Sequence, residues 1–154
     1  MHPDHAVRSR VEATVEALRY WVPTIADVAR VGESEAPGYW RLTMAPEVEG
    51  ACPLEMTLHE NQHFDLVLGG ELYEDRALAS LELLHPLLQA VTEGRVVQRR
   101  WISCATGAER AIETIVTLAD GSVWRDGRTN EAVAAAIPRE ATERHDHHFL
   151  PYRR

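Results

Sequence analysis

The stretch LEMTLHENQHFDLVLGGE, residues 54–71, decides which fold the sequence predicts. Every second residue from Leu54 to Leu58 is apolar, and the same alternation occurs from Phe64 to Leu68. An apolar residue at every second position is typical of a β-strand with one buried face. Two such runs joined by a few polar residues predict an antiparallel hairpin.

The apolar face also predicts the register of this hairpin. If Leu58 lies opposite Phe64, the apolar side chains of both strands share one face, whereas a slip of one residue would mix the two faces. The loop then consists of residues 60–62. In this register His59 lies directly opposite His63 on the polar face.

The rest of the chain contains both helical and strand periodicities. Apolar residues at steps of three and four predict an N-terminal helix that Pro23 ends. Gly69 and Gly70 interrupt a run of strand-forming residues, which favours a β-bulge, the alternative being a pocket floor beside Glu71 and Tyr73. The expected helices cover residues 4–21, 24–31, 75–93 (with a kink at Pro86) and 130–137; the expected strands cover 39–44, 54–59, 64–72, 96–104, 111–118 and 122–125; and residues 32–38 are expected to form a loop.

These elements have the order α(α)-βββ-α-βββ-α, in which groups of strands alternate with helices. We therefore predict the α+β class, with an antiparallel sheet of about six strands and helices packed on one face. Residues 1–138 are expected to form this single domain, because 154 residues is a usual length for one domain. Residues 139–154 are expected to form a polar, partly mobile C-terminal tail that contains histidine and arginine.

Composition excludes several classes of function. The net charge of −8 argues against nucleic-acid binding. No apolar run is long enough to cross a bilayer, and the first residues lack the apolar stretch of a secretory signal, so we expect a cytoplasmic protein without a membrane partner. All 16 basic residues are arginine, which excludes a Schiff-base lysine and a phosphate-binding P-loop lysine. Cys52 and Cys104 form no CxxC pair, so free thiols are expected.

Two groups of histidines are candidate metal ligands. His59 and His63, with Asp65 on the same strand face, form a partial shell for zinc or a similar ion. A structural zinc site needs four ligands, so the alternative is a hydrated hairpin tip.

The second group lies near the C-terminus and consists of His145, His147 and His148. An H-x-H pair places both rings on one side of a strand, where they can hold a metal together with other ligands. The alternative is that these histidines belong to a polar tail. We predict no cofactor, with a divalent metal as the alternative at these two groups.

Tyr73, Arg100, Trp101 and Glu113 are the candidate ligand-binding residues. An arginine on one strand can stack on a tryptophan and present its guanidinium to a small anionic ligand. The alternative is that the tryptophans lie in the core while arginines cover the outer face. No serine or cysteine lies in a recognisable nucleophile motif, so no catalytic residue is predicted and an enzyme is not favoured.

Two functions follow from this fold class. The first is a small, non-enzymatic binding or interaction module that associates with itself as a homodimer, or with a protein partner. The order of elements is loosely similar to that of type III secretion chaperones, which are small, acidic, dimeric proteins that hold an unfolded client. We adopt this first function as our expectation.

The second is a binder of small molecules, or an enzyme, with a pocket between helices and a curved sheet. Two helices, a hairpin, a helix and a long meander resemble the cone-shaped fold of nuclear-transport-factor-2-like proteins, which includes both enzymes and binders. Tyr20-Trp21-Val22-Pro23 is similar to a tetrapeptide in the small subunits of ring-hydroxylating dioxygenases. This reading requires a closed cavity with converging polar groups, whereas the first requires a filled interior and an exposed contact surface.

Overall fold

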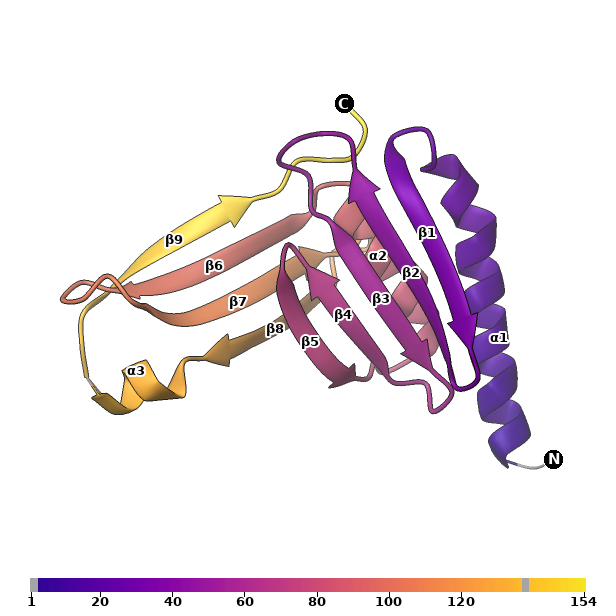
Figure 1. Ribbon diagram of the computed structural model, residues 1–154, viewed down its shortest axis with the longest axis horizontal. Helices are drawn as coiled ribbons and strands as arrows, with labels where there is room; N and C mark the ends of the chain where they lie inside the picture. The colour runs from indigo at the N-terminus through magenta and orange to yellow at the C-terminus, as the bar shows by residue number, and fades with distance from the viewer. Residues whose placement is uncertain (1–2, 137–138) are drawn as a thin grey trace.

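The computed structural model describes residues 3–136 and 139–154 as an α+β chain with two antiparallel sheets. Figure 1 shows the two sheets following each other along the longest axis, with α1 at one end and the second sheet at the other. The elements are α1 (Pro3–Trp21), η1 (Val22–Thr24), β1 (Ala29–Ala36), β2 (Tyr39–Pro46), β3 (Leu54–His59), β4 (Phe64–Leu68), β5 (Glu71–Arg76), η2 (Leu81–Leu83), α2 (Leu84–Thr92), β6 (Val96–Ser103), β7 (Glu109–Thr117), β8 (Val123–Thr129), α3 (Glu131–Ala136) and β9 (Thr142–His148).

The first sheet is a meander of five strands in the order β1-β2-β3-β4-β5. The predicted hairpin is its centre, and the predicted register is confirmed, because Leu58 pairs with Phe64. The backbone N–H of His59 donates to the carbonyl of His63 at 2.9 Å, which closes the hairpin loop. Successive side chains of a strand point to opposite faces of the sheet. The apolar side chains of each strand therefore lie on one face, which packs against the helices.

The main core lies between this sheet and the helices α1 and α2. Its fully buried side chains are mostly long aliphatic ones. Burial of each such side chain contributes about 1.5–3 kcal/mol to the free energy of folding. They include Leu18 of α1; Leu42, Met44, Met56, Leu58, Phe64, Leu66 and Leu68 of the sheet; and Leu84, Leu87, Leu88 and Val91 of α2. The centre of the space between these helices and the sheet is therefore filled by side chains.

The second sheet has the order β8-β7-β6-β9 and extends away from the first as an arm (Figure 1). Buried polar contacts join the arm to the first sheet. Gln98 of β6 donates to the carbonyl of Leu68 at 2.7 Å, and the hydroxyl groups of Tyr73 and Thr114 are hydrogen-bonded to each other.

The single sheet of about six strands and the predicted element order are wrong. Residues 32–38 form most of β1 and its turn instead of a loop. The helical piece expected at 24–31 is wrong, because only Thr24 belongs to η1 and residues 29–31 belong to β1. Gly69 and Gly70, with φ of 57° and 88°, form the turn between β4 and β5 rather than a bulge. Glycine suits this turn because positive φ is strained for other residues.

The helix expected at 75–93 is also shorter than predicted. Asp75 belongs to β5, and α2 begins at Leu84, so Pro86 lies in the first turn of α2. Proline is tolerated there because the first N–H groups of a helix have no intrahelical partner. The expected last helix is observed as α3, while residues 137–138 lie outside the described part of the chain.

Residues 139–154 do not form the mobile tail that we expected. Thr142–His148 is β9, which pairs with β6. Tyr152 is fully buried and donates a hydrogen bond to the carbonyl of Cys52 at 2.5 Å. A Cβ at Gly94 would lie 2.6 Å from the backbone nitrogen of Pro151, so only glycine allows the end of α2 to approach this segment.

None of the described helices is both long enough and apolar enough to span a membrane.

Candidate functional site

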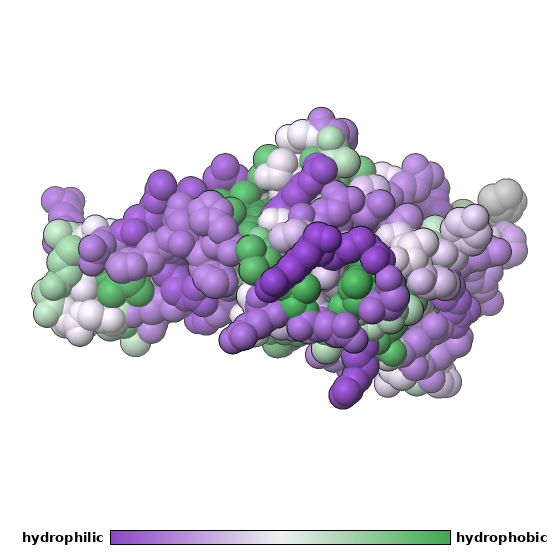
Figure 2. Space-filling view, turned by 90° about the horizontal axis from the view of Figure 1, so that it is seen from above, coloured by the Kyte–Doolittle hydropathy of each residue, from purple (hydrophilic) through white to green (hydrophobic). Residues whose placement is uncertain are grey.

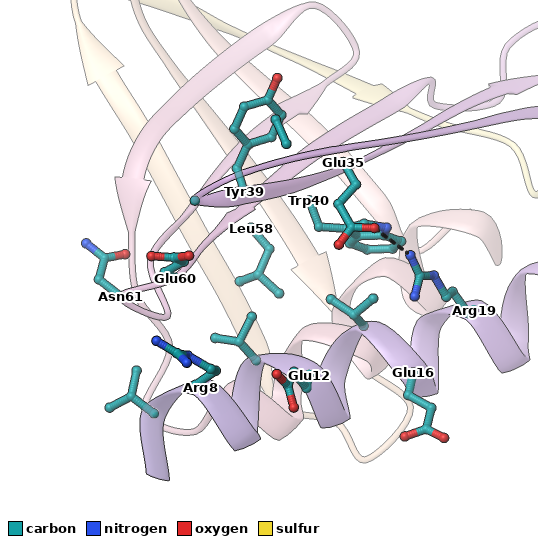
Figure 3. Close-up of a pocket in the computed structure, with 15 residues that line it drawn as sticks. Arg8, Glu12, Glu16, Arg19, Glu35, Tyr39, Trp40, Leu58, Glu60 and Asn61 are labelled. Carbon is teal, nitrogen blue, oxygen red and sulfur yellow. Dashed lines mark hydrogen bonds and ion pairs between the residues drawn. The ribbon is translucent and has the colours of Figure 1, made fainter. Parts of the chain in front are cut away.

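An open groove lies between α1 and the sheet edge formed by the β1–β2 turn and the β3–β4 loop. Figure 3 shows its side chains, with α1 along one wall and Leu58 and Glu60 on the other, while the ring of Tyr39 points away from the helix. The cavity volume is about 930 Å³. We call this site the α1 groove; it is lined by Val7, Arg8, Val11, Glu12, Val15, Glu16, Arg19, Glu35, Ala36, Gly38, Tyr39, Trp40, Leu58, Glu60 and Asn61.

The floor of the α1 groove is apolar. Val7, Val11 and Val15 are spaced by four residues and therefore share one face of α1. Val15 is buried, but Val7 and Val11 are only half-buried. Opposite them, Trp40 and Leu58 belong to the core of the first sheet. The valine stripe of α1 is thus covered at one end and accessible at the other.

A charged cluster closes the covered end of the groove. The guanidinium of Arg19 donates to Glu33 at 2.6 Å and to Glu35 at 3.3 Å. The indole N–H of Trp40 donates to the same Glu33 carboxylate at 2.8 Å. This indole hydrogen bond, together with Arg19, holds the pKa of Glu33 below its ordinary value. Glu33 is therefore ionised at neutral pH and fixes both side chains.

The rim of the groove carries more acidic than basic side chains. Four glutamates line it against two arginines, and Arg19 already belongs to the ion-paired cluster. The potential at the rim is therefore negative, in line with the net charge of −8.

A second, smaller hollow lies on another side of α1, against residues 78–82. Its volume is about 400 Å³, and Ala13, Ala17 and His85 contribute to its lining. The His85 ring packs on Trp21 with centroids 5.2 Å apart. The buried Nε2 atom of His85 has no hydrogen-bond partner among the described residues, and burial lowers the pKa of this imidazole.

The structure brings His59 and His63 side by side, as predicted, but gives each its own carboxylate. Nε2 of His59 lies 2.9 Å from Asp65, while Nδ1 of His63 lies 2.6 Å from Asp75. Asp75 also contacts Asp65, because its backbone N–H donates to that carboxylate at 2.9 Å. In residues 3–136 and 139–154, no three His, Cys, Asp or Glu side chains form a group that could hold a metal ion.

The C-terminal histidines lie on β9 and point to two faces of the second sheet. His145 and His147 share one face, and His148 is on the opposite face, because side chains alternate along a strand. Nε2 of His145 lies 3.3 Å from Glu143, and the His147 ring contacts the ring of Phe149.

Tyr73, Arg100, Trp101 and Glu113 do not converge on a common site. Tyr73 is buried at the junction of the two sheets. Arg100 pairs with Glu109 on one face of the second sheet, whereas Trp101 and Glu113 belong to the opposite face. Within the described chain, none of the four lines the α1 groove or the second hollow.

Sequence reasoning did not identify the α1 groove. The valine spacing predicts one buried stripe on the N-terminal helix, and nothing in that pattern separates the half-exposed Val7 and Val11 from the buried Val15. The groove depends on how far the β1–β2 turn extends along α1, which is a tertiary property.

Fold and groove together define an α+β chain of two antiparallel sheets with an accessible apolar groove beside its first helix. The chain matches no protein-family model, no curated protein and no solved structure.

Proposed function

We propose that this chain is a non-catalytic binding module that holds an apolar segment of a partner polypeptide in the α1 groove. The observation that carries this proposal is that Val7 and Val11 are only half-buried and line about 930 Å³ of accessible space beside the buried Trp40 and Leu58. Removing such apolar surface from water is the main favourable term in polypeptide association.

The dimensions of the groove suit a short segment. The helix from Val7 to Arg19 rises by roughly 18 Å at 1.5 Å per residue. An extended segment of about five or six residues covers that length at about 3.3 Å per residue. The negative rim favours a segment whose apolar residues are flanked by arginine or lysine, because rim charges steer association and select partners.

A matched pair of variants tests this function. Val7→Asp introduces a carboxylate at the accessible end of the groove, whereas Ser9→Asp introduces the same charge on the same helix at an exposed position that lines neither hollow. The probes are two synthetic peptides with identical leucine-rich centres, one flanked by lysines and the other by glutamates. Binding is measured by fluorescence anisotropy and by NMR of the valine methyl groups.

We expect the lysine-flanked peptide to shift the methyl signals of Val7, Val11 and Val15. We expect Val7→Asp to weaken its binding about tenfold, equivalent to about 1.4 kcal/mol, and Ser9→Asp to leave the affinity near the wild-type value. Equal affinities for both variants would show that the groove is not the binding site, and equal affinities for both peptides would show that the charge of the rim does not select the partner.

A second candidate function, a binder of small molecules, is supported by the second hollow with its unpartnered His85 nitrogen. Buried polar atoms are normally hydrogen-bonded, so an orphan nitrogen beside a hollow of about 400 Å³ is consistent with a ligand partner. NMR titration with a library of small molecules separates the two functions. A small ligand of this kind would shift the methyl groups of Ala13 and Ala17 and leave those of Val7 and Val11 unchanged.

A further inference from the structure

The strand β9 is a free edge of the second sheet. Within the described part of the chain β9 pairs only with β6, and all seven of its residues are exposed. In Figure 2, which views the molecule from above, the arm formed by this sheet is predominantly hydrophilic. An uncovered edge strand presents a row of backbone donors and acceptors to which another strand can pair.

The hydrogen bonds at the two ends of β9 show which backbone groups point outward. Cys104 donates to the carbonyl of Ala141, and Phe149 donates to the carbonyl of Val96. Odd-numbered residues of this segment therefore bond to β6, because bonding partners alternate along an antiparallel strand. The outward groups belong to the even-numbered residues Thr142, Arg144, Asp146 and His148.

The side chains of these outward residues are complementary to themselves. When two copies of β9 run antiparallel about a two-fold axis at His145, Arg144 of each copy lies opposite Asp146 of the other. Thr142 of each copy then lies opposite His148 of the other, so all four outward residues form hydrogen-bonded pairs. On the other face, Glu143 lies opposite His147, and the two His145 rings meet at the axis.

Neighbouring registers lack this complementarity. A shift that centres the axis on Arg144 places two arginines opposite each other, and a shift that centres it on Asp146 does the same with two aspartates. Directly opposed like charges destabilise a strand pair, whereas opposite charges stabilise it. The charge order Arg-His-Asp therefore favours the register centred on His145 over the registers centred on its two neighbours.

A row of alternating charges across the second sheet leads to the same edge. Glu113 pairs with Arg99, and Arg99 pairs with Asp146, whose carboxylate accepts its hydrogen bond at 3.0 Å. Arg125 of β8 begins the row, 3.5 Å from Glu113. Asp146 ends it at the free edge, where Arg144 of the same strand is 3.3 Å away. In the two-fold arrangement, Arg144 of a second copy continues this alternation directly opposite Asp146.

We propose that β9 is the dimerisation edge of this protein and that its partner is a second copy of the same chain, paired antiparallel about His145. The two four-stranded sheets then form one continuous sheet of eight strands. The α1 groove lies at the other end of the molecule (Figure 1), so dimerisation leaves it accessible and is tested separately from it.

Two complementary charge variants test the proposal, with sedimentation velocity as the readout. Arg144→Asp places carboxylates opposite each other in both cross-strand pairs, and Asp146→Arg does the same with guanidinium groups. Each variant alone is therefore expected to be monomeric under conditions in which the wild-type chain is a dimer. We expect an equimolar mixture of the two variants to return to the dimer mass, because every carboxylate of one chain then lies opposite a guanidinium of the other.

Proline variants test the backbone contribution independently of charge. Arg144→Pro removes an outward N–H group, which a monomer tolerates because proline is accepted at a free edge. Arg125→Pro is the matched control on β8, the opposite edge. Its N–H also points outward, because Leu118 donates to the carbonyl of Ser122 and Asn130 to that of Arg110. Circular dichroism verifies that each variant is folded.

We expect Arg144→Pro to abolish the dimer and Arg125→Pro to retain it. The proposal is overturned if the wild-type chain is monomeric at every concentration. It is equally overturned if the folded Arg144→Pro protein remains dimeric, or if the two folded charge variants do not associate when mixed.

Discussion

Burial decides the chemistry of several single residues in this chain. The thiol of Cys52 is fully buried, and burial raises its pKa to about 12, whereas Cys104 lies exposed in the turn after β6. His85 contacts Trp21 and keeps one ring nitrogen buried without a partner in the described chain. Residue type alone indicates none of these properties, because the surroundings that produce them come from distant segments.

The lowered pKa of His85 predicts a loss of stability in acid. Burial depresses the pKa of the folded imidazole below the ordinary value of 6.5, so the unfolded chain takes up this proton first. The contribution of His85 to stability is therefore complete above about pH 6.5 and falls as the pH decreases toward the folded pKa. We expect His85→Phe, which retains the ring contact, to reduce this acid sensitivity and to stabilise the fold by about 1 kcal/mol at neutral pH.

Urea denaturation of wild type and His85→Phe at neutral and mildly acidic pH measures this effect. The comparison cancels the titration of the other histidines and carboxylates, which both proteins share. An identical pH dependence in the two proteins would show that His85 titrates normally.

At the scale of elements, the segment after α3 differs most from our expectation. β9 and the residues that follow it pack against parts of the chain that lie far away in sequence. Ala51 forms a bridge with Leu150, and Tyr152 reaches the carbonyl of Cys52. The C-terminal segment therefore covers the main core beside Cys52, and its removal would expose that thiol.

Tyr152 is expected to hold this segment in place. Tyr152→Ala removes a fully buried ring, and we expect it to lower the free energy of unfolding by about 3–5 kcal/mol. Tyr152→Phe removes only the hydroxyl group and is expected to cost about 1–3 kcal/mol, since the carbonyl of Cys52 loses its donor.

Thiol labelling under native conditions checks the location of the effect. Cys104 is exposed, so we expect it to react rapidly in every variant and to serve as the internal reference. Cys52 is expected to react slowly in wild type, faster in Tyr152→Phe and fastest in Tyr152→Ala. Unchanged labelling of Cys52 in Tyr152→Ala would contradict the role of this residue as a cover for the core.

At the scale of the whole molecule, polar contacts join the two sheets at a junction beside an apolar core that both sheets share. The exposed ion pair between Arg128 and Glu71, with N–O distance 2.9 Å, lies at the periphery of this junction, while the buried amide of Gln98 lies at its centre. An unsatisfied buried carbonyl costs more than a lost surface ion pair, because water replaces only the latter. Of these two contacts, Gln98 therefore contributes more to the junction. The hydrogen bond between Tyr73 and Thr114 and the ion pair between Arg76 and Asp126 also hold the junction together.

Gln98→Leu is expected to destabilise the chain by about 1–3 kcal/mol, because the buried hydrogen bond from the amide of Gln98 to the carbonyl of Leu68 is lost. Arg128→Gln, at the edge of the same junction, is expected to cost less than about 1 kcal/mol. Urea denaturation gives both values, and hydrogen exchange of β6 and β7 shows whether the arm opens separately. The interpretation fails if Arg128→Gln is the more destabilising change.

The sequence by itself determined the α+β class, the hairpin at residues 54–71 and its register, because alternation along a strand is a local pattern that only one pairing satisfies. It also placed His59 beside His63. The tertiary structure alone decided that the strands divide into two sheets, that residues 142–148 complete the second one, and that a groove lies beside α1. These features depend on contacts between distant residues, such as Tyr152 and Cys52, which are 100 positions apart. No local periodicity encodes such contacts, since packing selects them from many pairings that are locally equivalent.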